Sequence, residues 1–398
     1  MVTLKSKGSI IFYKKSCVIF KKIQTKRKLT MNLFDLLVDE DELHPNFTRI
    51  MSDPYKVKLL EEWGEDQLIG RDGNGKFIKE FQTTFNSAFW ELYCYKVLQK
   101  LGAVFDFEHD APDFSVVLGG KKISIECTIA SNAKEMPMES DIEAHINDTK
   151  SLEETIYDQT VRLSNAFTKK VDKYQKSYCK KEWVKENPFI VAIEPFDQPY
   201  FMITGHEAIR LLLYGWKTEH KTFFDMYFDE IAKNEKSNLK MGLFTRPEYA
   251  DISGVLFSNT ATIGKVDAMS EDPNIVFGHL RYNLSYDRPL VSFDSRMKYK
   301  KNNFICEHIK RICSESHDLH KLYTIRRPLL QWNVDYKEDV VDGLMLFLNP
   351  YAKYPIHKDT IQLMKENGVN IISYDLSIDN DVWDVHDRSL IQRKVFKF

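Results

Sequence analysis

Two alternating stretches joined by Gly119-Gly120 are the feature that most restricts how this chain can fold. Residues 112–118 (PDFSVVL) and 121–128 (KKISIECT) each alternate apolar and polar side chains, which is typical of strands with one buried face. A Gly-Gly pair supplies the positive φ angles that a two-residue hairpin turn requires. The sequence therefore predicts an antiparallel hairpin with Gly119 and Gly120 as its turn.

The register of this hairpin places two acidic side chains opposite each other. Asp113 faces Glu126 on a polar face that also carries Ser115, Ser124 and Thr128. Like charges at directly opposed positions, with Cβ atoms about 4.5–5.5 Å apart, destabilise a sheet. Two explanations remain open: water screens the repulsion on an exposed face, or both carboxylates bind one divalent cation. The residues of the other face are apolar and are expected to be buried: Phe114, Val116, Ile123, Ile125 and Cys127.

A helix is predicted before the hairpin. Apolar residues at helical spacing predict one long amphipathic helix over residues 80–101, ending at Gly102. Glu91 lies on an uncharged stripe of this helix, and Glu80 falls on the same stripe. Glu91 is either a rim residue in contact with solvent or an acid that points at a cationic group.

A second helix is predicted after the hairpin, over residues 152–176. Its Arg162, Lys169 and Lys173 form a basic stripe, which is a candidate surface for binding nucleic-acid phosphates. Lys170 borders the apolar face of this helix. Its side chain either covers the edge of the core with its aliphatic stem or delivers an ammonium group to an anionic pocket.

Further apolar runs indicate that the sheet extends beyond the hairpin. Residues 188–193 are apolar on both faces and are predicted to form a central strand. Additional strands are predicted at 104–108, 252–257, 290–293, 343–348 and 370–374, with a helix over 205–214. A hairpin combined with strands separated by helices favours one α/β core.

Composition excludes several classes of protein. A chain of 398 residues with 43% hydrophobic residues is not a mostly disordered protein. No run approaches the roughly 18 apolar residues that a membrane helix needs, so we expect no membrane association. The six cysteines are scattered, which suits free thiols in a reducing compartment, and we expect a cytoplasmic protein. Residues 1–34 contain nine Lys or Arg and no acid, and we expect residues 1–30 to form a basic, disordered arm.

Several of these segments resemble the PD-(D/E)xK, or restriction-endonuclease-like, superfamily. The likeness lies in Glu91 within FWELY, Asp113 within PDF and Glu126 within IECT. It is closest to a largely uncharacterised bacterial branch that has E-x-T where the superfamily has E-x-K. The same branch resembles this chain in three further segments, at 165–174 (NAFTKKVDKY), 255–259 (VLFSN) and 348–352 (LNPYA).

The resemblance implies an α/β fold, with a restriction-endonuclease-like mixed central sheet flanked by helices. It implies four parts: the arm at 1–30, a helical region at 31–75, a nuclease-like core at 76–200, and a C-terminal α/β extension at 201–398 that continues the core. The implied activity is metal-dependent hydrolysis of phosphodiester bonds in nucleic acid. DNA is the expected substrate rather than RNA, and the expected role is restriction or defence against foreign DNA.

The resemblance also implies the site. Asp113, Glu126 and the Cys127 carbonyl would hold Mg²⁺ or Mn²⁺, and Glu91 would contact the metal or its waters. Family members carry a lysine two residues after the second acid. This chain has Thr128 there, whose hydroxyl can hydrogen-bond but carries no positive charge.

We therefore predict that Lys170 replaces the missing lysine, with Lys169 as the second choice. If neither reaches the metal, the expected alternative is a catalytically degenerate protein with the nuclease fold. Such a protein would bind nucleic acid or serve as a subunit of a larger complex, and a homodimer is also compatible with the sequence.

Overall fold

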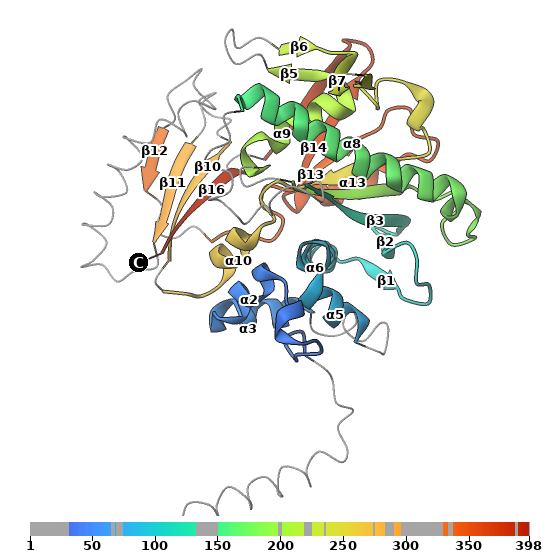
Figure 1. Cartoon of the computed structure of the whole chain (residues 1–398). Coiled ribbons are helices and arrows are strands. Elements are labelled where there is room, and N and C mark those ends of the chain that lie inside the picture. The colour runs from blue at the N-terminus through green and yellow to red at the C-terminus, as the bar shows by residue number, and fades with distance from the viewer. Residues whose placement is uncertain are drawn as a thin grey trace, which may run out of the picture.

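The computed structural model describes most of the chain after the predicted basic arm, which lies outside the described residues. The described residues are 32–64, 68, 75–132, 150–197, 201–218, 225–234, 236–273, 275–282, 290–295, 329–332, 337–386 and 389–397. Their centre is a mixed sheet of eight strands with helices on both faces (Figure 1). The expected α/β class with a large mixed central sheet is therefore confirmed.

The eight strands come from both halves of the chain. In spatial order they are β1 (Val104–Asp106), β2 (Phe114–Leu118), β3 (Lys121–Ser131), β4 (Phe189–Phe196), β9 (Gly254–Phe257), β13 (Met345–Leu348), β14 (Asn370–Asp375) and β15 (Asn380–Asp384). Strands β3, β4 and β9 are parallel, and β13 and β14 are parallel to each other but run opposite to β9. Every residue of β4 is buried, as predicted for a central strand.

The predicted hairpin is confirmed, with the predicted register. Phe114 pairs with Ile125, and the two turn glycines Gly119 and Gly120 have φ angles of 60° and 74°. All five residues of its predicted apolar face are buried. Because the side-chain period of a strand is two, this register also fixes the face on which Glu126 lies.

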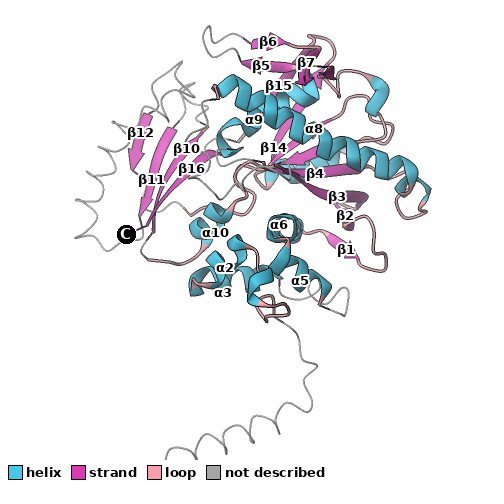
Figure 2. Cartoon of the chain, viewed as in Figure 1, coloured by secondary structure: helices cyan, strands magenta, loops and turns pink. Residues whose placement is uncertain are grey.

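Two layers of helices cover the sheet, each with its own hydrophobic cluster. Figure 2 shows α8 and α9 on one side of the sheet and α6 on the other. The first layer consists of α8 (Leu152–Lys176) and α9 (Phe201–Tyr214). The elements whose apolar residues join the other cluster are α2 (Pro45–Met51), α3 (Pro54–Gly64), α5 (Lys76–Thr83), α6 (Phe85–Lys100), α10 (Ile263–Met269) and α13 (Lys358–Glu366). Short 3₁₀ turns are η2 (Glu40–Glu42), η3 (Tyr178–Lys180) and η4 (Pro247–Tyr249).

The prediction of one helix over residues 80–101 is wrong. Two helices, α5 and α6, meet at Thr84, whose φ and ψ angles of −122° and 49° are not helical. The hydroxyls of Thr83 and Thr84 both donate to backbone carbonyls four residues earlier. Consecutive β-branched residues with hydroxyls that bond to the backbone weaken a helix at that point. Glu80 and Glu91 therefore lie on separate helices.

The helix predicted over 152–176 is confirmed as α8. Ser151 and Glu154 form a capping box at its start. Its apolar side, which includes Phe167 and Val171, is buried against the sheet. This packing places the basic residues of α8 along the edge of the face that carries Glu126.

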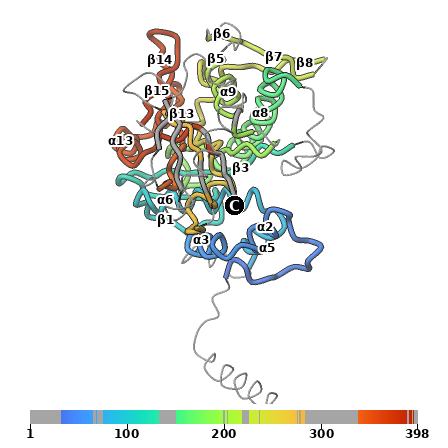
Figure 3. The backbone as a smooth tube through the Cα atoms, turned by 90° about the vertical axis from the view of Figure 1, so that its left-hand side faces the viewer, coloured from blue at the N-terminus to red at the C-terminus, as the bar shows by residue number. Residues whose placement is uncertain are grey.

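A second sheet and two hairpins lie beside the central sheet. The four-stranded sheet contains β12 (Leu329–Trp332), β11 (Leu290–Ser295), β10 (Ile275–Arg281) and β16 (Leu390–Lys397). The hairpins pair β5 (Trp216–Thr218) with β6 (Asp225–Tyr227) and β7 (Glu230–Asn234) with β8 (Ser237–Lys240). Figure 3 shows α2, α3 and α5 at the opposite end of the molecule from these hairpins. Among the described helices, none has both the length and the apolarity needed to cross a bilayer.

Candidate functional site

A pocket of about 160 Å³ opens where the β2–β3 hairpin meets α6 and α8. Residues from five elements and their flanks line it: Glu80, Ser87, Ala88, Glu91, Asp113, Glu126, Cys127, Thr128, Lys170 and Lys173. All four residues predicted to hold a metal are among them. So are Thr128 and the predicted replacement lysine, Lys170.

The hairpin positions the two acids. Asp113 lies directly before β2, and its Oδ2 accepts the backbone N–H of Cys127 at 2.7 Å. Glu126 lies within β3, and its side chain is only 1% exposed. Ser115 and Ser124 of the same face are also buried. The face is therefore covered, which rules out screening by bulk water as the explanation for the opposed acids.

Helix α8 brings two ammonium groups to a single oxygen of Glu126. Lys170 Nζ lies 2.7 Å from Glu126 Oε1, and Lys173 Nζ lies 2.9 Å from the same atom. Residues three apart on a helix share a face, which explains why both reach one carboxylate. The Lys170 side chain is 16% exposed and that of Lys173 is 50% exposed. The Lys173 side chain can therefore turn away from Glu126 into solvent more easily than that of Lys170.

The other two residues of the predicted basic stripe lie outside the pocket. Lys169 is exposed on α8, so the second choice for the replacement lysine does not line the site. Arg162 lies two turns nearer the start of α8, where its charge acts on Asp197. Of the predicted stripe, the structure brings only Lys173 to the acids.

Burial and charge shift the two carboxyl groups in opposite directions. Burial, strengthened by the negative charge of Glu126, raises the pKa of Asp113 to about 6, against the opposing effect of Lys170. Burial alone would also raise the pKa of Glu126, but Lys170 and Lys173 outweigh it, so this pKa is lowered. At neutral pH the pocket thus holds an ionised Glu126 beside an Asp113 that titrates close to the working range.

One oxygen of Glu126 is left without a donor. Among the described residues, Glu126 Oε2 is buried and has no hydrogen-bond partner within 3.5 Å. Tyr178 lies next to this carboxylate: burial, the Glu126 charge and a hydrogen-bonding interaction of the tyrosine hydroxyl with Glu126 raise the pKa of Tyr178. A buried carboxylate oxygen without a partner costs about 1–3 kcal/mol. This oxygen is the position at which a further ligand would be most stabilising.

The donor set suits a hard divalent cation. Four carboxylates line the pocket, those of Glu91, Asp113 and Glu126 with Glu80 at the rim, and oxygen ligands are those that Mg²⁺ and Mn²⁺ prefer. Within the described part of the chain, no three His, Cys, Asp or Glu side chains already form a group that could hold a metal. The carboxylates would therefore have to move together around a cation as it binds.

Cys127 contributes its backbone to the site and its side chain to the core. Its N–H bonds to Asp113, while its thiol is buried beside Cys94 of α6. Thr128 is half-buried at the pocket wall and, as predicted, offers no charge there. The positive charge near Glu126 comes from α8 instead.

Two ionisable side chains at or beside the pocket, Glu80 and Tyr178, were not among the predicted site residues. Glu80 reaches the rim from α5, and the break at Thr84 removes the helical spacing that linked it to Glu91. Tyr178 comes after α8, where no periodic pattern remains to place it. Its ring lies 4.9 Å from Lys173 Nζ, so it contacts both the acid and one of its lysines.

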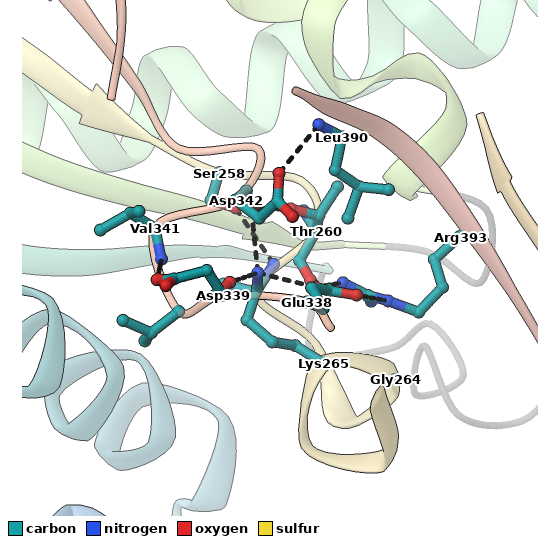
Figure 4. A network of polar contacts seen from close by, with 12 residues as sticks. Ser258, Thr260, Gly264, Lys265, Glu338, Asp339, Val341, Asp342, Leu390 and Arg393 are labelled. Carbon is teal, nitrogen blue, oxygen red and sulfur yellow. Dashed lines mark hydrogen bonds and ion pairs between the residues drawn. The ribbon is translucent and has the colours of Figure 1, made fainter. Parts of the chain in front are cut away.

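A second charged cluster was not predicted at all. It joins α10, the segment before β13 and β16, as Figure 4 shows. Glu338 Oε1 accepts Lys265 Nζ at 2.8 Å, and its Oε2 accepts Arg393 Nε at 2.6 Å. The side chains of Lys265 and Glu338 are 0% and 1% exposed. We call Lys265, Glu338 and Arg393 the buried triad.

Comparisons with known proteins gave no match: no family model fits the chain, and neither curated proteins nor solved structures are similar to it. The likeness to the PD-(D/E)xK superfamily therefore depends on the residues of this chain alone and stays a prediction.

Proposed function

We propose that this protein is a metal-dependent nuclease of the restriction-endonuclease-like fold that hydrolyses phosphodiester bonds. The observation that carries the proposal is the gathering of Glu91, Asp113, Glu126 and Lys170 around one pocket. These residues come from two helices and a hairpin, and the pocket also contains a buried carboxylate oxygen without a donor. DNA is the proposed substrate rather than RNA, and the proposed setting is cytoplasmic restriction or defence.

Each pocket residue has a role in this proposal. Asp113, Glu126, Glu91 and the Cys127 carbonyl hold Mg²⁺ or Mn²⁺. The bound cation would lower the pKa of a water molecule and neutralise the charge that develops on the scissile phosphate. Lys170 stays beside Glu126, where its ammonium orients the attacking water and stabilises negative charge in the transition state.

Phosphate contacts come from the basic residues of α8. Lys173 is half-exposed at the pocket and meets the phosphate next to the scissile bond. Lys169 and Arg162 lie further along the helix and contact neighbouring phosphates. The Thr128 hydroxyl donates to an oxygen at the pocket wall.

The test is cleavage of supercoiled plasmid in Mg²⁺ or Mn²⁺, compared with a single-stranded RNA. We expect Asp113→Asn and Glu126→Gln to lower the rate about 10²–10³-fold, because each removes charge that holds the cation. Asp172→Asn is the matched control, since this acid is exposed on α8 and pairs with Lys176. Wild-type rates in Asp113→Asn or Glu126→Gln would refute the assignment of these ligands.

A second candidate is a protein that keeps the fold without turnover. One observation favours it: Lys170 and Lys173 already neutralise Glu126, so the site is stable without a cation. Such a protein would bind nucleic acid or act as a subunit of a larger complex. It would retain labelled DNA in EDTA with a steep salt dependence, and the wild-type protein would cleave neither plasmid nor RNA at any metal concentration.

A further inference from the structure

We infer that Lys173 blocks the metal site until nucleic acid draws it away, so that cation uptake and nucleic-acid binding depend on each other. This inference rests on the proposed function, because it concerns the same pocket. It assigns Lys173 a regulatory role in addition to phosphate contact.

The first step is the crowding of positive charge at one atom. Both ammonium groups touch Glu126 Oε1, so they stand within about 6 Å of each other and repel. A divalent cation bound to Glu126 would add two more positive charges at the same place. Three charges of one sign cannot share one carboxylate without a large electrostatic cost, so at least one lysine has to leave.

The charge balance of the pocket supports the loss of one lysine. Glu80 at the pocket rim pairs with Lys76, which lies outside the pocket, at 3.7 Å, so the balance concerns the other three acids. Glu91, Asp113 and Glu126 carry three negative charges when all are ionised, and the two lysines carry two positive charges. A divalent cation with both lysines in place gives a net charge of +1. The same cation with only Lys170 in place gives a neutral pocket.

Exposure decides which lysine leaves. The Lys173 side chain is 50% exposed, whereas that of Lys170 is 16% exposed. The half-exposed Lys173 ammonium regains hydration when it turns outward, so its release costs less than the release of the more deeply buried Lys170. The other contact of Lys173, the ring of Tyr178 at 4.9 Å, is weak at a half-exposed position. Lys170 stays with Glu126 and keeps its catalytic role.

A polyanion is the partner that draws Lys173 out. Lys173 lies on the surface of α8 near Lys169 and Lys176, which are both exposed. A phosphate group on this surface gives the Lys173 ammonium a new partner and frees Glu126 for the cation. By thermodynamic linkage, the cation must then raise the affinity for nucleic acid by the same factor that nucleic acid raises affinity for the cation.

The experiment measures Mn²⁺ binding to the full-length protein by calorimetry in the absence of nucleic acid. We expect Lys173→Met to tighten Mn²⁺ binding about 5–50-fold relative to wild type, because the competing ammonium is gone. Lys176→Met is the control, since it removes an equal charge one turn along the same helix. Among the described residues, the ion pair of Lys176 is with Asp172. We expect Lys176→Met to change Mn²⁺ affinity less than about 3-fold.

The second measurement is the fluorescence anisotropy of a labelled 12-base-pair phosphorothioate duplex. Mn²⁺ should tighten duplex binding to wild type about 5–50-fold and to Lys173→Met by much less. Equal Mn²⁺ affinity in wild type and Lys173→Met would overturn the inference while leaving the proposed function intact. Absence of Mn²⁺ binding in both proteins, or full binding in Glu126→Gln, would overturn the proposed function and the inference with it.

Discussion

Glu126 and Glu338 are two buried acids that each pair with two cationic side chains, but they differ in how many of their carboxylate oxygens receive a hydrogen bond. Each side chain is 1% exposed, and each accepts two cationic groups from elements far away in the sequence. At Glu338 both oxygens have donors, with Lys265 and Arg393 on Oε1 and Arg393 on Oε2. At Glu126 both lysines crowd onto Oε1 and leave Oε2 without a donor.

The number of hydrogen-bond donors distinguishes Glu338, whose two carboxylate oxygens both have donors, from Glu126, for which we propose a functional role. The buried triad joins the second sheet to the central sheet, and Lys265 and Arg393 hold the pKa of Glu338 well below its usual range despite burial. Glu126 instead borders a pocket, and one of its two lysines is half-exposed. A buried acid with an unused oxygen beside a cavity has room for a ligand, whereas a saturated acid has none.

The largest expected effect is on stability at the buried triad. Glu338→Gln leaves Lys265 and Arg393 without a negative partner in the interior, which costs about 3–5 kcal/mol. Glu126→Gln also leaves two lysines, but the half-exposed Lys173 can turn to solvent and Lys170 keeps the nearby Asp113 carboxylate, so we expect a cost of about 1–2 kcal/mol. Urea unfolding of both variants measures the difference. Equal losses of unfolding free energy in the two variants would contradict the proposed difference between Glu126 and Glu338.

The next effect is on catalysis, within the pocket itself. Lys170→Met removes the ammonium that stays beside Glu126, and we expect plasmid cleavage to slow about 10²–10³-fold. Lys169→Met removes the same charge from the neighbouring exposed position and should slow cleavage less than about 5-fold, through weaker phosphate contact only. Similar rates for the two variants in single-turnover assays would show that the α8 lysines act only through their charge on the surface.

A smaller effect is expected at Asp197, a buried acid whose hydrogen-bond donor, Gln159, is neutral. Burial raises the pKa of Asp197 from 3.8 to about 7, although Gln159 opposes the shift. The folded chain therefore keeps a proton that the unfolded chain loses between these values, and stability falls as the pH rises through this range. Asp197→Asn cannot lose the proton and should be about 1–3 kcal/mol more stable than wild type at pH 8.

The control for this prediction is the same pair of proteins at pH 4. There Asp197 is protonated in the folded chain and about 40% protonated in the unfolded one, so the stabilisation should fall below about 1 kcal/mol. A difference in unfolding free energy that does not change between pH 4 and pH 8 would mean that Asp197 is ionised in the folded protein, like Glu338.

Local patterns were enough to predict the hairpin and α8, two of the elements that form the pocket. The Gly-Gly pair fixed the hairpin register, and helical spacing located α8 with its correct ends. Each of these elements is a continuous segment of at most 25 residues, the scale at which periodicity and turn chemistry act. Lys170 was predicted from the family resemblance, as the replacement for the lysine missing at Thr128, and the structure places its ammonium beside Glu126.

Two kinds of feature were not predictable in this way: a local break in a helix, and contacts between segments far apart in the sequence. The break at Thr84 depends on a local competition for backbone carbonyls that an apolar pattern does not reveal. The buried triad brings together residues 265, 338 and 393, and nothing in the sequence near any of them indicates the other two. A sequence pattern also cannot indicate that Lys170 and Lys173 both donate to the same oxygen of Glu126.

The most direct test of the central claim is a crystal structure of the protein grown with MnCl₂ and measured at the manganese absorption edge. We expect an anomalous peak bonded to Glu126 Oε2 and Asp113, with Lys173 turned towards solvent and Lys170 still beside Glu126. A pocket without an anomalous peak, with both lysines still on Glu126 Oε1, would contradict the account.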